Sequence, residues 1–327
     1  MKNTQVIQLM SIVRLSIFML GITMMSCNSK KEQQLPAIGK SVALFDYFSY
    51  KGNDDFYISN PLSDEDYFYN PILPGWYSDP SVCTNGEGDY FLVTSTFTYF
   101  PGVPIFHSKD LVNWKQIGHV LNRASQLVNM EGQKVSGGIF APAISYNPYN
   151  KTYYMVTTNV GAGNFFVKTQ DPFGEWSEPV MLPEVGGIDP SFFFDEDGKA
   201  YIVNNDEAPD NKPEYSGHRT IRIQEFDVKT DKTVGPRKIL VNKGAQPADK
   251  PIWIEGPHLY KINGKYFLMS AEGGTGNWHS EVIFRGDSPM GKFLPWKNNP
   301  ILTQRHLNSD RPNSVTCAGH ALSLIHI

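Results

Sequence analysis

A four-fold recurrence of one short pattern limits the folds that this chain can adopt. Each copy starts with a proline, passes through a turn rich in glycine, asparagine or aspartate, and continues into an apolar run that begins with tyrosine. The prolines are Pro80, Pro142, Pro190 and Pro257, and the tyrosines are Tyr90, Tyr153, Tyr201 and Tyr266. Short apolar runs between such turn residues are typical of β-strands. Each copy therefore predicts a β-hairpin.

The spacing of the copies predicts how the hairpins are arranged. Successive prolines lie 62, 48 and 67 residues apart, and further strand-forming residues follow each hairpin, as at 107–114. Each unit is therefore long enough for a four-stranded sheet, and repeated four-stranded units indicate a β-propeller. A β-sandwich is the alternative all-β architecture, but it gives no reason for the recurrence.

A fifth copy of the pattern begins at 316–321, shortly before the last residue, Ile327. A ring that lacks most of one blade has unpaired strand edges, so we expect the chain to be incomplete at its C-terminus. We predict an all-β fold, namely a five-bladed β-propeller over residues 70–327 with the fifth blade largely missing.

Acidic residues recur at one position of the pattern. Asp79 and Asp189 directly precede their prolines, Glu255 lies one position earlier in the fourth copy, and Ala141 occupies the position in the second. The first strand of each propeller blade lines the central channel, so we expect the three carboxyl groups to share one site. Crowded carboxyl groups shift one another's pKa values, which suits general acid and base catalysis. Taken singly, an Asp-Pro pair is more often an ordinary turn.

The N-terminus has the features of a targeting segment. Lys2 and Arg14 supply positive charge, an apolar run occupies 15–22, and the small residue Ser26 precedes Cys27. The run is too short to span a membrane. This arrangement resembles a bacterial lipobox, in which the cysteine is lipidated.

We therefore predict a lipoprotein-type signal peptide at 1–27, with Cys27 as the lipidation site, and a tether and N-terminal extension at 28–69. The protein would then be an exported, cell-envelope lipoprotein of the outer membrane or periplasm, which contacts the membrane only through its lipid anchor. An ordinary cleaved signal peptide is the alternative.

Charge and cysteine content exclude two classes of protein. The formal net charge is −4 and the chain has no large basic cluster, so we expect no nucleic-acid partner. Three cysteines in 327 residues do not form a disulfide framework. We expect Cys83 and Cys317 to be buried free thiols.

Four segments resemble motifs of glycoside hydrolase family 43. They are 70–81 (NPILPGWYSDPS), 94–114 (TSTFTYFPGVPIFHSKDLVNW), 187–191 (GIDPS) and 254–261 (IEGPHLYK). The resemblance covers roughly residues 70–321 and is strongest toward the β-xylosidase and α-L-arabinofuranosidase branch. It implies a five-bladed propeller that hydrolyses glycosidic bonds with inversion of configuration. The substrates would be xylan, arabinoxylan or oligosaccharides derived from them.

The resemblance also implies a role for each acid. Asp79 would be the general base that activates water, Glu255 the general acid that protonates the leaving oxygen, and Asp189 a third acid that orients Glu255 and tunes its pKa. A non-catalytic surface glycan-binding propeller is the alternative, and the loss of one acid would favour it. A fructan-type hydrolase would show an Asn-Asp-Pro-Asn-Gly opening, where this chain has Ser-Asp-Pro-Ser at 78–81.

Four further residues are site candidates with less specific signals, and three of them, Phe100, Phe140 and His320, match family positions. Phe100 and Phe140 would line the sugar pocket, although ordinary core packing explains them equally well. Arg219 would bond a sugar hydroxyl or lie on the surface. His320 matches a histidine near the propeller axis that, in some members, helps to hold calcium through water. We expect no required cofactor and keep a structural calcium ion as an alternative. Sequence does not separate β-xylosidase from α-L-arabinofuranosidase.

Overall fold

The computed structural model describes residues 55–63, 66–312 and 314–324. The predicted signal peptide with Cys27, and most of the predicted tether, lie outside these residues. A short helix, α2 (Asp55–Ser59), belongs to a separate N-terminal unit, and residues 62–327 form the second unit. None of the helices in the described ranges is long and apolar enough to cross a membrane.

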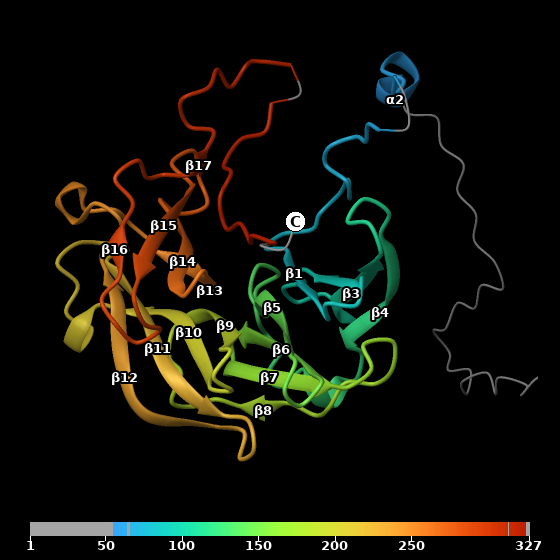
Figure 1. Cartoon of the computed structure of the whole chain (residues 1–327). Helices are drawn as coiled ribbons and strands as arrows, with labels where there is room; N and C mark the ends of the chain where they lie inside the picture. The colour runs from blue at the N-terminus through green and yellow to red at the C-terminus, as the bar shows by residue number, and fades with distance from the viewer. Residues whose placement is uncertain (1–54, 64–65, 313, 325–327) are drawn as a thin grey trace, which may run out of the picture. The chain divides into compact units, whose positions relative to one another are not determined.

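The second unit consists of four antiparallel sheets whose strands follow chain order (Figure 1). Blade 1 contains β1 (Ser81–Thr84), β2 (Tyr90–Val93), β3 (Gly102–Ser108) and β4 (Lys115–Leu121). Blade 2 contains β5 (Ile139–Asn147), β6 (Thr152–Asn159), β7 (Gly163–Thr169) and β8 (Val180–Met181). Blade 3 contains β9 (Ile188–Phe194), β10 (Ala200–Glu207), β11 (Arg219–Asp227) and β12 (Lys232–Asn242). Blade 4 contains β13 (Glu255–Ile262), β14 (Lys265–Glu272), β15 (Ser280–Gly286) and β16 (Leu294–Pro295), with β17 (Leu302–Thr303) paired to β15.

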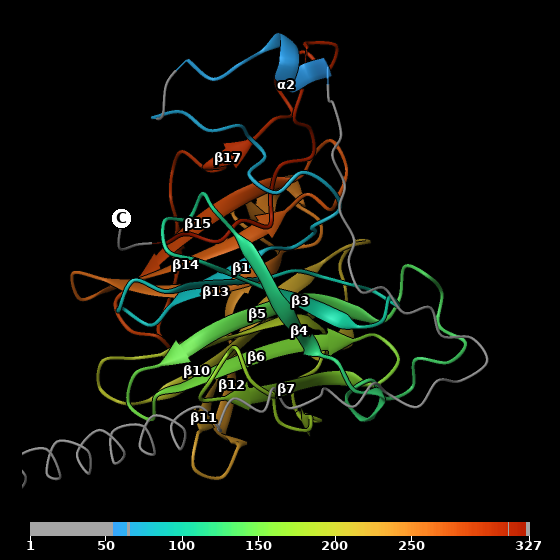
Figure 2. The same cartoon turned by 90° about the vertical axis from the view of Figure 1, so that its right-hand side faces the viewer.

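The four predicted hairpins are the first two strands of the four blades. Strand β2 begins at its tyrosine as predicted, whereas β6, β10 and β14 begin one residue before theirs. The first strands of successive blades contact one another, β1 with β5, β5 with β9 and β9 with β13. The strands of one blade run side by side when the view is turned, as β5, β6 and β7 show (Figure 2).

The all-β propeller arrangement is confirmed, with four blades. The fifth blade, predicted to begin at 316, is not seen in the described part of the chain, where 314–324 contain no strand. Three short 3-10 helices lie in the connections, at Ala124–Gln126, Pro209–Asn211 and Pro247–Asp249.

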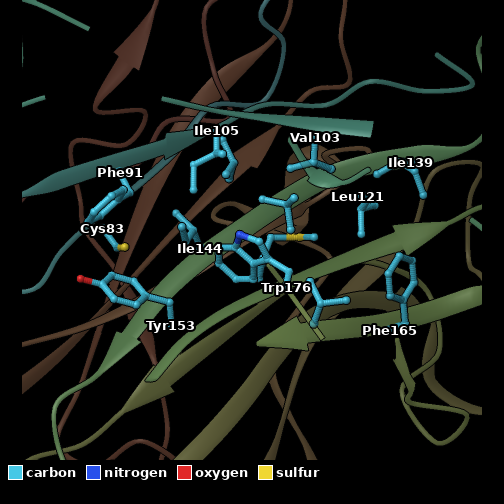
Figure 3. Packing of buried hydrophobic residues seen from close by; sticks show 14 residues of the cluster. Cys83, Phe91, Val103, Ile105, Leu121, Ile139, Ile144, Tyr153, Phe165 and Trp176 are labelled. Carbon is cyan, nitrogen blue, oxygen red and sulfur yellow. The ribbon is translucent and has the colours of Figure 1, made fainter. Parts of the chain in front are cut away.

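The blades are joined by apolar cores that lie between neighbouring sheets. Strand β6 is buried over its whole length because its two faces enter different cores. Tyr153 and Met155 pack in the core shared with blade 1, where Phe91 lies 5.2 Å from Tyr153 between ring centroids (Figure 3). Tyr154 and Val156 pack in the core shared with blade 3. Side chains alternate between faces along a strand, so a continuous apolar run is what such a blade requires.

Both described cysteines are free, as predicted. Cys83 is buried in the core between blades 1 and 2, and burial raises the pKa of its thiol far above the ordinary value. A buried thiol of this kind is chemically inert. Cys317 is only partly buried, so the prediction of burial is wrong for this residue.

Candidate active site

The residue before each recurring proline has a left-handed backbone conformation. The φ angles are 52° at Asp79, 36° at Ala141, 54° at Asp189 and 56° at Gly256. In blades 2, 3 and 4 the pairing of the first and second strands shifts register at this point. Proline cannot donate to a strand ladder and is tolerated at bulges, and bulges redirect side chains. The pattern that predicts a Pro-led strand is therefore a bulge at the start of blades 2, 3 and 4, and blade 1 shares only the left-handed residue before its proline.

The four left-handed positions and their prolines or neighbours meet around one small cavity. It is lined by Asp79, Pro80, Ser81, Ala141, Pro142, Ala143, Asp189, Pro190, Gly256, His258 and His320. Its volume is about 10 Å³, close to what a single water molecule requires. The structure thus brings two predicted acids, Asp79 and Asp189, and the predicted His320 to a shared site.

Glu255 lies beside this cavity, and its offset by one position has a steric cause. In blade 4, Gly256 takes the left-handed position that aspartate takes in blades 1 and 3. A Cβ atom on Gly256 would lie 2.7 Å from His320 Nε2, so no acidic side chain fits there. The carboxyl group of this blade is therefore carried by the preceding residue.

Asp79 is held from blade 1 and blade 2 together. Ser95, which follows β2, donates a hydrogen bond from Oγ to Asp79 Oδ2 at 2.6 Å. The same Oγ accepts a hydrogen bond from the Ala141 backbone N–H at 2.7 Å. On the other side, His320 Nδ1 lies 3.6 Å from Asp79 Oδ1. Sequence reasoning did not find Ser95, because nothing in its neighbourhood signals a contact with Asp79 or with the next blade.

Asp189 is buried, with 5% of its surface exposed. Its Oδ2 accepts a hydrogen bond from the Gly256 N–H at 3.1 Å, and its own N–H donates to Thr158 Oγ1 at 3.2 Å. Burial raises the pKa of the Asp189 carboxyl, and the negative charge of Asp79 raises it further, against the opposing effect of His320. Two close carboxyl groups cannot both ionise freely.

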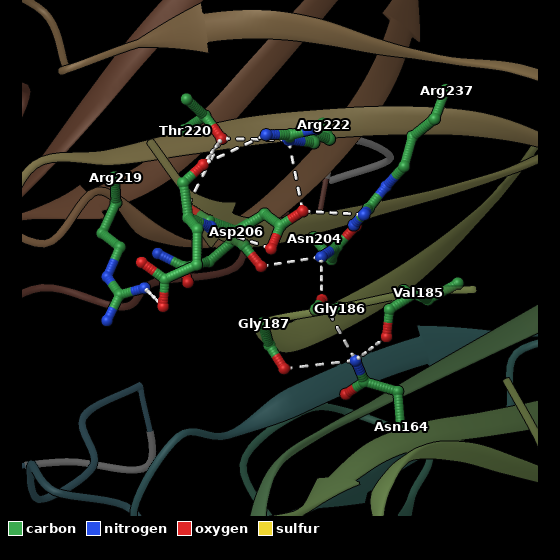
Figure 4. A network of polar contacts seen from close by, with 12 residues as sticks. Asn164, Val185, Gly186, Gly187, Asn204, Asp206, Arg219, Thr220, Arg222 and Arg237 are labelled. Atoms are coloured by element: carbon green, nitrogen blue, oxygen red, sulfur yellow. Dashed lines mark hydrogen bonds and ion pairs between the residues drawn. The ribbon is translucent and has the colours of Figure 1, made fainter. Parts of the chain in front are cut away.

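A polar network supports the segment that leads into Asp189 (Figure 4). Asn164 Nδ2 donates to the Gly187 carbonyl at 3.2 Å and also to the carbonyls of the two residues before it. Asn204 Nδ2 donates to the carbonyl that precedes Gly187 at 2.6 Å. Arg237 then joins Asn204, at 3.0 Å, to Asp206, at 2.7 Å. This turn is therefore fixed from both β7 and β10.

Glu255 is the acid whose environment differs most from water. Its side chain is buried, and burial raises its pKa to about 8, with further contributions from Asp189 and Asp79. The positive charge of Arg219 opposes this shift. The pKa of the Glu255 carboxyl therefore lies above the ordinary range of glutamate.

Arg219 lies at this site, at the start of β11. Its guanidinium group stacks over the Trp253 ring at 4.4 Å and pairs with Glu207. Because Trp253 is two residues from Glu255, this stack holds a positive charge near the acid. The structure shows no substrate, so a bond from Arg219 to a sugar hydroxyl stays a prediction.

An aromatic cluster adjoins the Asp79 side of the cavity. Phe140 packs edge-on against Phe97 at 5.5 Å, and Phe97 stacks with Trp76 at 5.4 Å, which in turn contacts Tyr99 at 5.3 Å. Trp76 and Tyr99 are more than half exposed, and exposed ring faces suit sugar rings. Trp76 and Phe97 were not among the predicted residues.

Phe100, in contrast, has no ring contact within the described residues and is 59% exposed. The structure therefore places Phe140 in the aromatic cluster and Phe100 outside it.

The residues around His320 do not form a ligand set for directly bound calcium. Calcium takes six to eight oxygen ligands, whereas His320 offers only nitrogen and the cavity has room for about one water. Across 55–63, 66–312 and 314–324, no group of three or more His, Cys, Asp or Glu side chains is arranged to hold a metal. Calcium held through water stays a prediction.

The fold and cavity define a β-propeller with clustered carboxyl groups at its axis, and comparison with known proteins agrees. The profile of Glycosyl hydrolases family 43 matches residues 68–325. A xylosidase/arabinosidase of Butyrivibrio fibrisolvens is 48% identical over 77% of this chain and 47% of its own length. A non-reducing end alpha-L-arabinofuranosidase of Bacteroides ovatus is 41% identical over 78% of this chain and 44% of its own length. The chain belongs to glycosyl hydrolase family 43.

A solved structure gives the same result. The crystal structure of a GH43_12 protein from a capybara gut metagenome is 55% identical, with a TM-score of 0.76, over 82% of this chain and 49% of that one. The chain thus spans about half the length of the relatives that it matches.

Proposed function

We propose that this chain is the propeller of a glycosidase that releases xylose or arabinose from xylan, arabinoxylan or derived oligosaccharides with inversion of configuration. Relatives named for xylosidase and arabinosidase activity support the substrate class. The observation that carries the proposal is the convergence of Asp79 and Asp189 on one cavity, with the buried Glu255 next to the cavity residue Gly256.

In this proposal Glu255 is the general acid, because its raised pKa keeps a proton available for the leaving oxygen near neutral pH. Asp79 is the general base that activates water, since it lines the cavity and is oriented by Ser95. Asp189 is the third acid, and its charge adds to the effect of burial in raising the pKa of Glu255. Inversion requires the base and acid carboxyls roughly 6.5–9.5 Å apart, with a water between them.

The remaining predictions accompany this proposal. The aromatic cluster with Phe140, together with Phe100 and Arg219, would bind the sugar, and a fifth blade would complete the ring. Export as a lipoprotein anchored at Cys27 would place the enzyme where polysaccharide fragments are met. Mass spectrometry of the mature N-terminus would test the anchor directly.

Substitution of the two principal acids tests the chemistry. We expect Asp79→Asn, assayed on nitrophenyl xyloside or nitrophenyl arabinofuranoside, to lower kcat by about 10²–10⁴-fold. We expect a loss of the same size for Glu255→Gln on arabinoxylan oligosaccharides, whose sugar leaving group needs the proton of the acid. Circular dichroism should be unchanged in both variants. Glu196→Gln, at an exposed glutamate that pairs with Lys261, is the matched control and should keep full turnover. Normal rates in either acid variant would overturn the assigned roles.

The pH profile and the product test the mechanism further. We expect kcat/KM to fall as pH rises through about 8, as Glu255 loses its proton. NMR of the released sugar should show the inverted anomer, and retention of configuration would contradict the role of Asp79. Binding of arabinoxylan without any hydrolysis would instead favour the glycan-binding alternative.

A further inference from the structure

We infer that Glu281, with His279 beside it, is a positioning residue of the site: it fixes the backbone of the 317–321 segment so that the His320 ring stays against Asp79. Only the effect on turnover rests on the proposed function. The positional claim rests on hydrogen bonds and packing alone.

Glu281 is fully buried on β15 and binds the chain next to His320. Its Oε2 accepts a hydrogen bond from the Ala321 N–H at 2.9 Å, and the carboxyl also accepts one from the His320 N–H. Its other oxygen, Oε1, has no hydrogen-bond partner among the described atoms. The carboxyl group is therefore directed at two consecutive backbone N–H groups.

His279, two residues before Glu281 in the sequence, also binds the 317–321 segment. Its Nδ1 lies 2.8 Å from the Cys317 carbonyl oxygen, which can only accept, so Nδ1 carries the proton. A Cβ atom on Gly319 would lie 2.7 Å from His279 Nε2, so the segment passes directly over the ring. His279 directly precedes β15 and Glu281 is the second residue of that strand, so both lie close enough to bind the one stretch of chain.

The 317–321 segment depends on Glu281 and His279 for its position because it does not pair with a neighbouring strand. Residues 314–324 contain no strand, and both Cys317 and His320 have left-handed backbones, with φ of 56° and 55°. Buried backbone groups need partners, and here Glu281 supplies the partner that a neighbouring strand would otherwise provide.

The His320 imidazole has close neighbours on both of its edges. His320 Nδ1 lies 3.6 Å from Asp79 Oδ1, and on the opposite edge of the ring Nε2 would lie only 2.7 Å from a Cβ atom on Gly256. Gly256 also donates to Asp189. A shift of the 317–321 segment would therefore alter the surroundings of two of the three acids at once.

The buried carboxyl also carries a cost that simple packing does not require. An unpartnered buried oxygen destabilises a fold, and an apolar side chain would fill the same space without it. Burial raises the pKa of Glu281 to about 8, so the group is neutral at pH 7. Glutamine, which is neutral and keeps an accepting oxygen, is therefore the conservative replacement.

The test measures the coupling of His320 to Asp79 by NMR of histidine-labelled full chain, with the His320 signal assigned from His320→Asn. We expect Asp79→Asn to shift the His320 ring signal in the wild-type background and in Glu281→Gln. In Glu281→Ala the same substitution should cause less than half of that shift. An undiminished shift in folded Glu281→Ala would overturn the inference.

Two further variants keep the test decisive. Glu272→Gln is the control, because Glu272 is a partly buried glutamate of blade 4 that also accepts a backbone N–H, from Ala245 at 2.8 Å, and it should leave the coupling unchanged. If Glu281→Ala does not fold, Glu281→Asp retracts the carboxyl by one methylene, and it should reduce the coupling as well. Full coupling in Glu281→Asp would then contradict the inference.

Turnover gives the second readout. Because a misplacement of about 1 Å can cost up to about 10²-fold, we expect Glu281→Ala to lower kcat at least tenfold with little change in KM, and Glu281→Gln to restore most of it. If no variant or wild type hydrolyses pentosides while the NMR coupling behaves as stated, the proposed function fails and the positional inference stands.

Discussion

Blades 2 and 3 begin with the same backbone bulge and differ in the side chain at its left-handed residue. Both have a left-handed residue before proline and a shift in strand register, yet blade 2 has Ala141 where blade 3 has Asp189. The bulge therefore forms without a carboxyl group. The acid is an addition to the bulge and not a requirement for it.

The surroundings of the two residues differ accordingly. The Ala141 N–H bonds a single hydroxyl, that of Ser95. Asp189 is reached by a turn fixed through Asn164, Asn204 and Arg237, and its carboxyl is bonded by the next blade. Burying a carboxyl group costs free energy. The larger number of hydrogen bonds around Asp189 offsets part of that cost.

The largest effect on this comparison should come from Gly187→Ala. Gly187 has φ of 66°, and a Cβ there would overlap the carbonyl oxygen of Asn205. We expect a loss of about 3–5 kcal/mol of unfolding free energy, measured by urea denaturation. Gly198→Ala is the matched control, because Gly198 also has positive φ, 83°, but open space around it. Gly198→Ala should cost only about 1 kcal/mol of unfolding free energy. Equal losses in the two variants would show that backbone strain, and not the overlap with Asn205, causes the loss in Gly187→Ala.

A smaller effect should follow from exchanging the two side chains. Because the pKa of Asp189 is raised in the folded state, its carboxyl destabilises the folded protein increasingly as pH rises. Asp189→Asn should therefore stabilise the protein by about 2 kcal/mol at pH 8, with the gain vanishing as pH falls to the ordinary range of aspartate. Ala141→Asp should do the reverse, losing stability as pH rises.

Thermal unfolding followed from pH 4 to pH 8 measures both variants on one scale. Opposite slopes relative to wild type would support the view that the bulge is structural and the acid functional. A loss of stability in Asp189→Asn at every pH would mean that its bond to Gly256 matters more than the burial of its charge.

Much of the architecture was predictable because it depends on local pattern. Recurring Pro-led hairpins predicted the four blades that the structure shows, as part of an expected five, and their phase placed Asp79 and Asp189 in one cavity. The apolar run 153–156 was predictable as a strand, but its division between two cores depends on neighbouring blades. The predicted fifth blade is not formed by the described residues, since 314–324 contain no strand.

What escaped prediction depends on contacts between residues far apart in the chain. Ser95 meets Ala141 across a blade boundary, Glu281 meets Ala321 across 40 residues, and Trp76 meets Phe97 only after folding. No periodicity or turn signal marks such pairs. The offset of Glu255 shows the same limit, because its reason is the space that His320 occupies next to Gly256.

The smallest effect should come from Ser95→Ala, which tests the link between the acid of blade 1 and the bulge of blade 2. Its hydroxyl donates to Asp79 and accepts from Ala141, so the substitution removes two hydrogen bonds and leaves a buried N–H without a partner. We expect a loss of about 1 kcal/mol in urea denaturation, with Ser309→Ala at an exposed site as control. Because Ser95 also orients the carboxyl of Asp79, turnover should fall more than stability does. A variant with unchanged kcat and lowered stability would show that the serine serves only the bulge, and that Asp79 is held in place by His320.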